Sequence, residues 1–335
     1  MKAVARYSPL PIDHPDSLVD TTLPDPTPGP RDLLVRVHAV SVNPVDVKVR
    51  AATAIPGGQP KVLGYDAAGV VEAVGSDVSL FKPGDRVYYA GDITRSGSNA
   101  ELQVVDERIV GRMPASLKFA EAAALPLTAI TAWELLFDRL GANADTQGTL
   151  LVVGAAGGVG SILVQLARHL TKMTIVGTAS RPETQQWVRD LGAQHVIDHT
   201  KPLGEGLKAA GIGPVQMVAS LTHTDQHYAH IVEALAPQGR LGLIDDPAKP
   251  LDVMALKRKA LSLHWEMMFA RPMFQTADMQ AQHDLLNRVS ELVDAGHVRT
   301  TASEHFGPIT AANLKRAHAL IETGRAKGKV VLEGF

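Results

Sequence analysis

The sequence contains no cysteine among its 335 residues, and this absence removes several kinds of chemistry at once. Disulfides, thiolate nucleophiles, iron–sulfur clusters and cysteine-ligated zinc sites all require that side chain. An excess of charge is also missing, because 33 Lys and Arg residues against 35 Asp and Glu residues give a net charge of −2. Binding to nucleic acid draws much of its free energy from counterions released by basic side chains. We therefore expect no nucleic-acid partner.

Long apolar segments are lacking as well. The most apolar stretch, residues 150–164, contains four glycines and a serine. It is shorter than the roughly 20 residues that a membrane helix needs. The first residues lack the apolar segment of a signal peptide. We expect a cytoplasmic protein with no membrane partner.

Several catalytic motifs do not occur. There is no G-x-S-x-G nucleophile turn and no G-x-x-x-x-G-K-[ST] phosphate loop, and no tyrosine is followed four residues later by lysine. Among the histidines, His223 and His227 would share a helix face, but no Glu follows His223 to complete a zinc motif. We expect no bound metal.

The distribution of turn residues and apolar runs predicts two kinds of structure. Residues 1–115 are rich in proline and glycine turns, with short strand patterns at 33–40, 68–74 and 86–90. After two expected helices at 119–125 and 129–140, strand and helix patterns alternate. The expected strands are 149–153, 173–178, 195–198, 215–220, 240–245 and 261–265, and the expected helices are 159–170, 182–191, 203–210 and 224–235. Such alternation predicts an α/β fold with a doubly wound parallel sheet beside a β-rich domain.

The tail of the chain departs from this alternation. Residues 277–295 and 311–323 have helix patterns, and 329–332 has a strand pattern. This segment could return to the first domain and make that domain discontinuous.

A glycine-rich turn joins the first strand of the alternating region to its helix. Gly154, Ala155, Ala156, Gly157, Gly158 and Val159 form the turn, and Gly160 follows in the helix. In dinucleotide-binding proteins such a turn must be tight, must let the backbone approach a pyrophosphate, and must let the helix pack on the strand. Between a strand and a helix, this pattern predicts cofactor binding, and a purely structural glycine turn is the alternative.

The end of the second strand indicates which cofactor binds. An NAD site usually has Asp or Glu there, to accept from the ribose hydroxyl, whereas this chain has Thr178, Ser180 and Arg181. A guanidinium group can pair with a 2′-phosphate, so we expect NADPH. Residues 180–183 also match a helix capping box with Pro182 at the first helical position. The two roles are compatible.

Several segments together resemble the medium-chain dehydrogenase/reductase superfamily. They are the motif from Gly64 to Gly75, the Lys82-Pro83-Gly84-Asp85 turn, the segment 124–132, the 154–160 turn, Pro237-Gln238-Gly239 and the closing residues 328–332. The chain is most similar to the zinc-free quinone oxidoreductase branch, including bacterial proteins called zinc-type alcohol dehydrogenase-like. The resemblance implies a doubly wound Rossmann domain over 121–270 that binds NADP. It also implies a discontinuous, β-rich GroES-like domain over 1–120 and 271–335, and a homodimer.

The resemblance also implies roles for particular residues. Tyr65 would donate a hydrogen bond or proton to a substrate carbonyl, and the alternative is that it only lines the wall of the pocket. Asn43 and Asp46 would also take part in catalysis. Asp66 would only support a turn. The further cofactor contacts would come from Thr131, His199, Leu221, Ile244 and Lys329. Trp265 and Phe269 would line the substrate pocket, or else serve core or dimer packing.

The zinc-binding members of the superfamily use Cys and His where this chain has Asn43, Tyr65 and the apolar Leu125-Pro126-Leu127. A zinc ion would therefore lack its usual ligands. We predict an NADPH-dependent, zinc-independent reductase of quinones or α,β-unsaturated carbonyls. The alternatives are a zinc-type alcohol dehydrogenase and a non-catalytic nucleotide-binding relative, either crystallin-like or RNA-binding, and the net charge opposes RNA.

Overall fold

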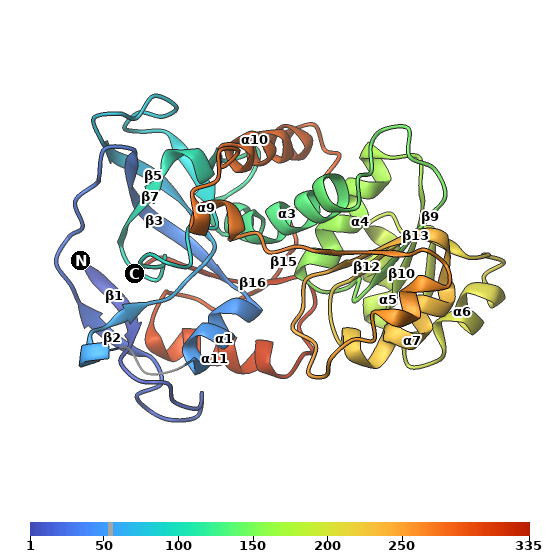
Figure 1. Ribbon diagram of the computed structural model, residues 1–335. Coiled ribbons are helices and arrows are strands. Elements are labelled where there is room, and N and C mark those ends of the chain that lie inside the picture. Colours follow the sequence, from blue (N-terminus) through green and yellow to red (C-terminus); the bar gives the residue numbers. More distant parts are fainter. Residues whose placement is uncertain (53–55) are drawn as a thin grey trace. The chain divides into compact units, whose positions relative to one another are not determined.

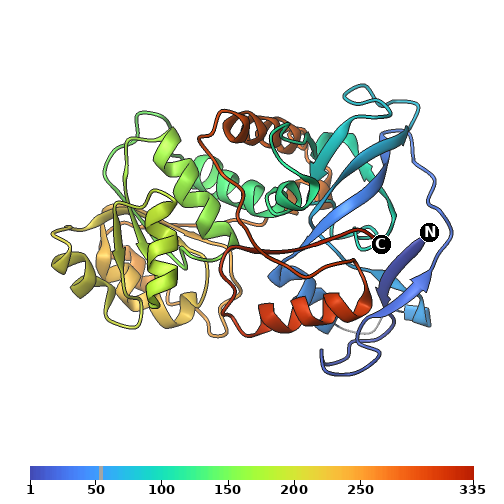
Figure 2. The same ribbon diagram turned by 180° about the vertical axis from the view of Figure 1, so that it is seen from behind.

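A computed structural model describes residues 1–52 and 56–335 of the chain. The described residues divide into two compact units. The first unit is discontinuous and combines Met1–Ile130 with Phe269–Phe335. The second unit is the intervening segment, Thr131–Met268. Figures 1 and 2 show opposite sides of the chain, coloured along the sequence.

The first unit is built around two β-sheets. The larger has seven strands and mixes segments from both ends of the chain, because β16 pairs antiparallel with β3. Its strands are β3 (Asp32–Val42), β5 (Ala67–Val74), β6 (Arg86–Tyr89), β7 (Leu102–Asp106), β8 (Val110–Arg112), β15 (Ala302–His305) and β16 (Lys329–Glu333). The smaller sheet contains β1 (Lys2–Arg6), β2 (Val19–Thr22) and β4 (Lys61–Val62) in the order β2-β1-β4.

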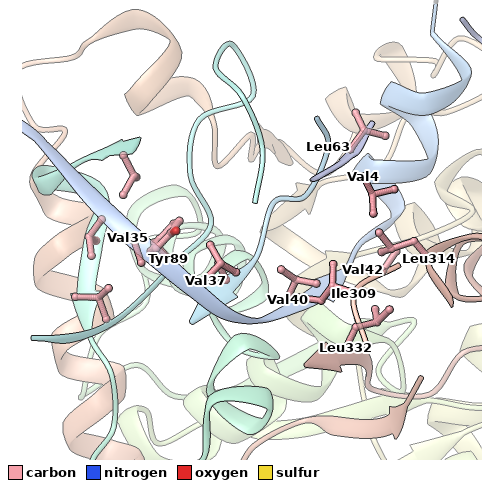
Figure 3. Packing of buried hydrophobic residues seen from close by; sticks show 14 of the residues in the cluster. Val4, Val35, Val37, Val40, Val42, Leu63, Tyr89, Ile309, Leu314 and Leu332 are labelled. Carbon is pink, nitrogen blue, oxygen red and sulfur yellow. The ribbon is translucent and has the colours of Figure 1, made fainter. Parts of the chain in front are cut away.

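Aliphatic side chains from these strands form one apolar core. Along β3, Leu33, Val35 and Val37 alternate with more exposed residues, as a strand with one buried face requires. Figure 3 shows Leu314 and Leu332, from the C-terminal segment, packed among the β3 valines. Burial of these side chains is what holds the two parts of the discontinuous unit together.

Helices complete the first unit. Helix α1 (Pro44–Ala51) follows β3 directly, with Asn43 at its N-cap and Pro44 at its first position. The remaining helices are α2 (Phe119–Ala123), α9 (Ala270–Phe274), α10 (Ala281–Asp294) and α11 (Ala311–Glu322), with short 3-10 turns at Pro56–Gly58 and Glu107–Ile109. Helix α3 (Pro126–Trp133) begins in this unit and ends in the second.

The second unit contains a six-stranded parallel sheet in the order β11-β10-β9-β12-β13-β14. Its strands are β9 (Thr149–Val153), β10 (Thr174–Thr178), β11 (His195–Ile197), β12 (Val215–Ser220), β13 (Leu235–Leu243) and β14 (Ser262–Trp265). Helices cover both faces of this sheet (Figures 1 and 2). They are α4 (Gly158–Leu170), α5 (Pro182–Asp190), α6 (Leu203–Ala209), α7 (Thr224–Ala234), the short α8 (Met254–Lys257) and the π-helix η3 (Glu134–Arg139). The predicted doubly wound parallel sheet and the separate β-rich unit are therefore confirmed.

Some predicted elements differ from the observed ones. The helix expected at 277–295 begins only at Ala281, because Thr276 and Asp278 form a turn in which the Thr276 hydroxyl donates to the Asp278 carboxylate. Strand β13 starts five residues earlier than the expected 240, and the helix expected at 129–140 changes to π geometry at Glu134. Helix α1 and strand β15 were not predicted.

One helical stretch, Phe119–Arg139, is long and apolar enough to cross a membrane by length and composition. In the structure, 83% of its most apolar window is buried inside the protein. This is the behaviour of a core helix, since a membrane span would present its apolar side chains outward.

Candidate functional site

Most of the predicted cofactor residues of the second unit lie at one edge of its sheet. Gly154, Ser180, His199, Leu221 and Ile244 each lie within two residues of the last residue of a strand. All six strands are parallel, so these strand ends lie at the same carboxyl edge. Ligands of doubly wound sheets bind outside this edge.

Three glycines of the turn have three different physical roles. Gly154 has a φ of 83°, which a residue with a side chain rarely adopts, and its N–H donates to the Thr178 hydroxyl at 3.0 Å. A Cβ at Gly160 would lie 2.5 Å from the Gly154 carbonyl oxygen, so α4 can pack here only without a side chain. A Cβ at Gly157 would meet only that same oxygen, at 3.5 Å. Packing therefore does not require glycine at position 157, and the space beside it is free for a ligand.

This edge of the sheet suits an anion. Helix α4 has 13 residues and begins at Gly158, so its first N–H groups point toward the turn. Arg181 pairs with Glu183 at 3.1 Å, and its side chain is 40% exposed. The residues present therefore fit a dinucleotide, whose pyrophosphate the turn and the first N–H groups of α4 would hold.

The predicted capping box at residues 180–183 is wrong. Helix α5 has Arg181, not Ser180, at its N-cap, and no side chain caps it. Pro182 does occupy the first helical position, and Glu183 pairs with Arg181 instead of with the Ser180 backbone. Ser180 is thus free of the capping role and lies partly exposed beside Arg181.

The ring of His199 lies near that of His227 from α7, with the two centroids 6.1 Å apart. Burial and the other histidines at this corner lower the pKa of His227, and burial with His223 lowers that of His199. Both rings are consequently neutral at pH 7 in the free protein.

In the first unit, a buried ion pair lies directly after Tyr65. The Lys329 ammonium donates to the Asp66 carboxylate at 3.0 Å, to the Val42 carbonyl at 3.1 Å and to the Asn43 side-chain oxygen. Asp66 also accepts from the Asn43 amide and from the Leu127 N–H, each at 2.7 Å. Lys329 and Asp66 are at most 3% exposed. All three ammonium hydrogens of Lys329 have partners within the unit, so its side chain supports Asp66 and Asn43 in this structure. Its contact with a cofactor stays a prediction.

Asp46 occupies a similar supporting position. Its carboxylate accepts from the N–H groups of Asn43 at 2.7 Å and Gly64 at 3.0 Å, which ties α1 to the Gly64-Tyr65-Asp66 segment. Burial raises the pKa of Asp46 to about 7, although the two N–H donors and Lys329 oppose that rise.

Tyr65 differs from its neighbours in that its hydroxyl is unused. The side chain is fully buried, and the hydroxyl has no hydrogen-bond partner among the described residues. The Phe269 ring packs edge-on against it, with centroids 5.5 Å apart. Burial, together with the nearby Asp46, raises the pKa of Tyr65, so the phenol stays protonated. The structure thus brings Asn43, Asp46 and Tyr65 together and leaves one donor available.

The other predicted residues lie elsewhere. Thr131 is buried on α3 at the start of the second unit, and Trp265 ends β14 with 51% of its surface exposed.

The sequence alone predicts only a turn-supporting role for Asp66. A carboxylate inside an apolar run such as residues 62–71 is rarely buried without a partner, and that signal could have revealed its cation.

The positions where zinc members carry ligands are chemically unsuited to zinc. Asn43 uses its side-chain amide on Asp66 and Lys329, Tyr65 is a protonated phenol, and the third segment is apolar. Across residues 1–52 and 56–335, no group of three His, Asp or Glu residues is arranged to hold a metal ion. These side chains do not fit a zinc ion.

Comparison with known proteins identifies the class. Residues 29–126 match the alcohol dehydrogenase GroES-like domain, and residues 191–332 match the zinc-binding dehydrogenase family. A zinc-type alcohol dehydrogenase-like protein of Staphylococcus aureus (strain MSSA476) is 38% identical over 99% of both chains. A GroES-like unit with a Rossmann-like unit defines an oxidoreductase that uses a nicotinamide cofactor. The chain belongs to the medium-chain dehydrogenase/reductase superfamily.

Two solved structures are also similar. A candidate zinc-dependent alcohol dehydrogenase from Rhizobium etli CFN 42 is 58% identical, with a TM-score of 0.96 over 100% of this chain and 98% of the other. A quinone oxidoreductase from Coxiella burnetii is 26% identical, with a TM-score of 0.82 over 100% of this chain and 99% of the other.

Proposed function

We propose that the protein is an NADPH-dependent, zinc-independent reductase of quinones or α,β-unsaturated carbonyl compounds. The observation that carries this proposal is the Tyr65 hydroxyl, a buried, protonated donor without a partner among the described residues. A buried donor without a partner destabilises the free protein. A hydrogen bond from this donor to a substrate oxygen removes that cost and so favours binding. The similarity to a quinone oxidoreductase supports the same class of substrate.

The cofactor would supply hydride, and this chain's residues would prepare the acceptor. When hydride reaches the β-carbon of an enone, negative charge develops on the carbonyl oxygen. A hydrogen bond from Tyr65 stabilises that charge more than it stabilises the neutral substrate. The Lys329–Asp66 pair and Asp46 would hold the Gly64-Tyr65-Asp66 backbone in place, and Phe269 would have to move aside for the substrate oxygen to reach the hydroxyl.

Reduction of this kind does not depend on a metal. Oxidation of an alcohol needs a Lewis acid or a base to remove the hydroxyl proton, and zinc usually provides it. A conjugated carbonyl or a quinone already accepts hydride readily and needs only a weak proton donor. The neutral phenol and amide donors at Tyr65 and Asn43 suit this second reaction.

The Tyr65 role is tested by Tyr65→Phe, with Tyr89→Phe as a matched control. Tyr89 is equally buried, and its hydroxyl also lacks a partner, but it lies in the apolar core among the β3 valines (Figure 3). Removing one donor from a developing oxyanion typically costs about 10²–10³ in rate. We expect that loss in kcat for enones with Tyr65→Phe, an unchanged NADPH Kd, and wild-type activity with Tyr89→Phe. If Tyr65→Phe retains more than half the wild-type enone rate, Tyr65 does not act as the donor in catalysis.

The preference for NADPH is tested at Arg181. A charge-assisted pair with the 2′-phosphate is worth about 1.5–3 kcal/mol. Arg181→Ala should therefore weaken NADPH by roughly 10- to 100-fold and NADH hardly at all. Arg189→Ala, an exposed arginine on the same helix, is the control and should affect neither. Equal losses for both cofactors would contradict the assignment.

We also propose a homodimer formed through β14. This strand is the last in its sheet, and among the described residues no strand pairs with its outer side. Trp265 and the nearby Met267 expose 51% and 49% of their surfaces. A free edge with large apolar side chains favours pairing with a second copy about a two-fold axis.

A further inference from the structure

A histidine without a hydrogen-bond partner lies inside the first unit. His318 is on α11 and is 0% exposed, and neither its Nδ1 nor its Nε2 has a partner among the described residues. A neutral imidazole has one N–H donor and one acceptor nitrogen, and buried groups of this kind nearly always find a partner. Packing alone therefore holds the ring in place, and the proposed reaction does not use it.

His318 lies next to an ion pair that joins α11 to α1. The two helices pack against each other (Figure 1), and Arg50 of α1 pairs with Glu322 of α11. Residues four apart share a helix face, so Glu322 and His318 lie on the same side of α11. The side chain of Arg50 is 3% exposed and that of Glu322 is 33% exposed. The unpaired ring is thus beside a buried guanidinium that already has its carboxylate.

The other charged groups around α11 do not compensate a charge on this ring. Besides α1, helix α11 packs on β2, β3 and β16. The remaining titratable side chains on these elements, on α11 and on the segment beside Arg50 contact other residues or are exposed, and they are Asp13, Asp20, Asp32, Arg36, His38, Asp46, Lys48, Lys315, Arg316, Lys329 and Glu333. Within residues 1–52 and 56–335, no carboxylate accepts from the ring.

Protonation of His318 is therefore unfavourable while the two helices are packed. The protonated ring would have two N–H donors without acceptors, and it would add a second cation beside one partly exposed carboxylate. Burial, with a smaller effect of Arg50, accordingly lowers the pKa of His318 to about 3. An exposed histidine takes up a proton near pH 6.5. Acid thus favours forms of the protein in which His318 has left its buried position.

We propose that His318 makes the packing of α11 on α1 an acid-sensitive latch, which is closed at neutral pH and loosens in mild acid as the imidazole becomes protonated. Above about pH 7 the ring is neutral in the closed and open forms, so the latch keeps its full stability. Each pH unit below about 6 favours the open form by a further factor of about ten, until the ring can be protonated in place.

The latch would act on the candidate site through α1. Asn43 is the N-cap of this helix, and the Asp46 carboxylate in its first turn accepts from the Gly64 N–H at 3.0 Å. Opening of the latch would therefore release the segment that carries Tyr65. The latch itself depends only on packing within the first unit, so it does not depend on the proposed reaction.

Hydrogen exchange of the full chain, followed by mass spectrometry, tests the latch. Between pH 7.5 and 4.5, protection factors in peptides of α1 and α11 should fall roughly 100-fold more in the wild type than in His318→Gln. Glutamine has no proton to gain, and carboxyl groups that titrate in this range affect both proteins. His318→Leu should match His318→Gln, and it removes both unpaired nitrogens. His14→Gln changes an exposed histidine of the same unit and should match the wild type.

The same exchange data test the connection to the site. A peptide that contains Gly64 should lose protection in parallel with α1 in the wild type and not in the His318 variants. Equal pH responses of the wild type and both His318 variants would overturn the latch. Protection at Gly64 that stays constant while α1 opens would overturn its connection to the site.

NMR of wild-type protein with ¹³C-labelled histidine rings observes the imidazole directly. The His318 signals are those missing from His318→Gln or His318→Leu. They should keep the chemical shifts of a neutral ring down to pH 4.5, for as long as the native amide signals persist. A His318 ring that becomes protonated near pH 6.5 within the native protein would overturn the proposal, because the closed latch would then accept the proton without cost.

Discussion

Replacing Lys329 with methionine removes the cation that pairs with the fully buried Asp66 carboxylate. Asp66 would keep hydrogen bonds from Asn43 and the Leu127 N–H but lose the ammonium group at 3.0 Å. Breaking a buried ion pair by removing one partner typically costs about 3–5 kcal/mol, because the remaining charge cannot be solvated. We expect Lys329→Met to lower the free energy of unfolding of the first unit by that amount at pH 7.

The same variant should show a characteristic pH dependence. Burial raises the pKa of Asp66 and Lys329 opposes the rise, so the pKa climbs further when Lys329 is lost. A folded-state pKa above the unfolded value means that stability is greatest at low pH and declines as pH rises through the folded pKa. The deficit of Lys329→Met should therefore shrink toward about pH 4, where Asp66 is protonated even in the unfolded chain.

Urea unfolding followed by far-UV circular dichroism suits this test, because tryptophan fluorescence reports only the second unit. Lys329→Met with Asp66→Asn should recover most of the loss, since no charge is then left unpaired. Lys82→Met breaks an ion pair in which Lys82 is 78% exposed and should cost at most about 1 kcal/mol. The reasoning fails if Lys329→Met costs no more than Lys82→Met, or if the double variant is no more stable than the single one.

Gly157→Ala should leave the free energy of unfolding within about 1 kcal/mol of wild type but weaken cofactor binding. Gly160→Ala should lower the free energy of unfolding by about 1–3 kcal/mol, because its Cβ would overlap the Gly154 carbonyl oxygen. Equal stability of the two variants in urea would contradict these roles. Chelator treatment should leave reductase activity unchanged, with far less than one zinc per chain by elemental analysis, and stoichiometric zinc that is needed for activity would favour the alcohol dehydrogenase alternative. Trp265→Glu should convert the dimer to a monomer in size-exclusion chromatography with light scattering, and a wild-type monomer at micromolar concentration would rule out the β14 interface.

Much of the second unit follows from sequence alone. Strands β9 and β12 have the predicted bounds, because turn residues flank them and, apart from Gln216, their inner positions are apolar. The glycine turn was recognised because its requirements, a positive φ at Gly154 and close packing at Gly160, involve only neighbouring residues and leave a local mark in the sequence. Helix α1 also has a local signal in the sequence, an N-cap Asn43 followed by Pro44 at the first helical position.

Only the tertiary structure decided which polar groups are paired and which are free. Lys329 and Asp66 are 263 residues apart in sequence, and Arg139 and Glu266, which also form an ion pair, are 127 residues apart. The residues around Lys329 in the sequence do not show that its three donors are already used and not available to bind a phosphate. Nor do the neighbours of Tyr65 distinguish it from other buried tyrosines. Hydropathy patterns report whether a side chain is buried, because burial depends on the periodicity of its own segment. The partner of a buried polar group depends on which distant segments the fold brings beside it, and that is fixed only when the sheets and helices have packed.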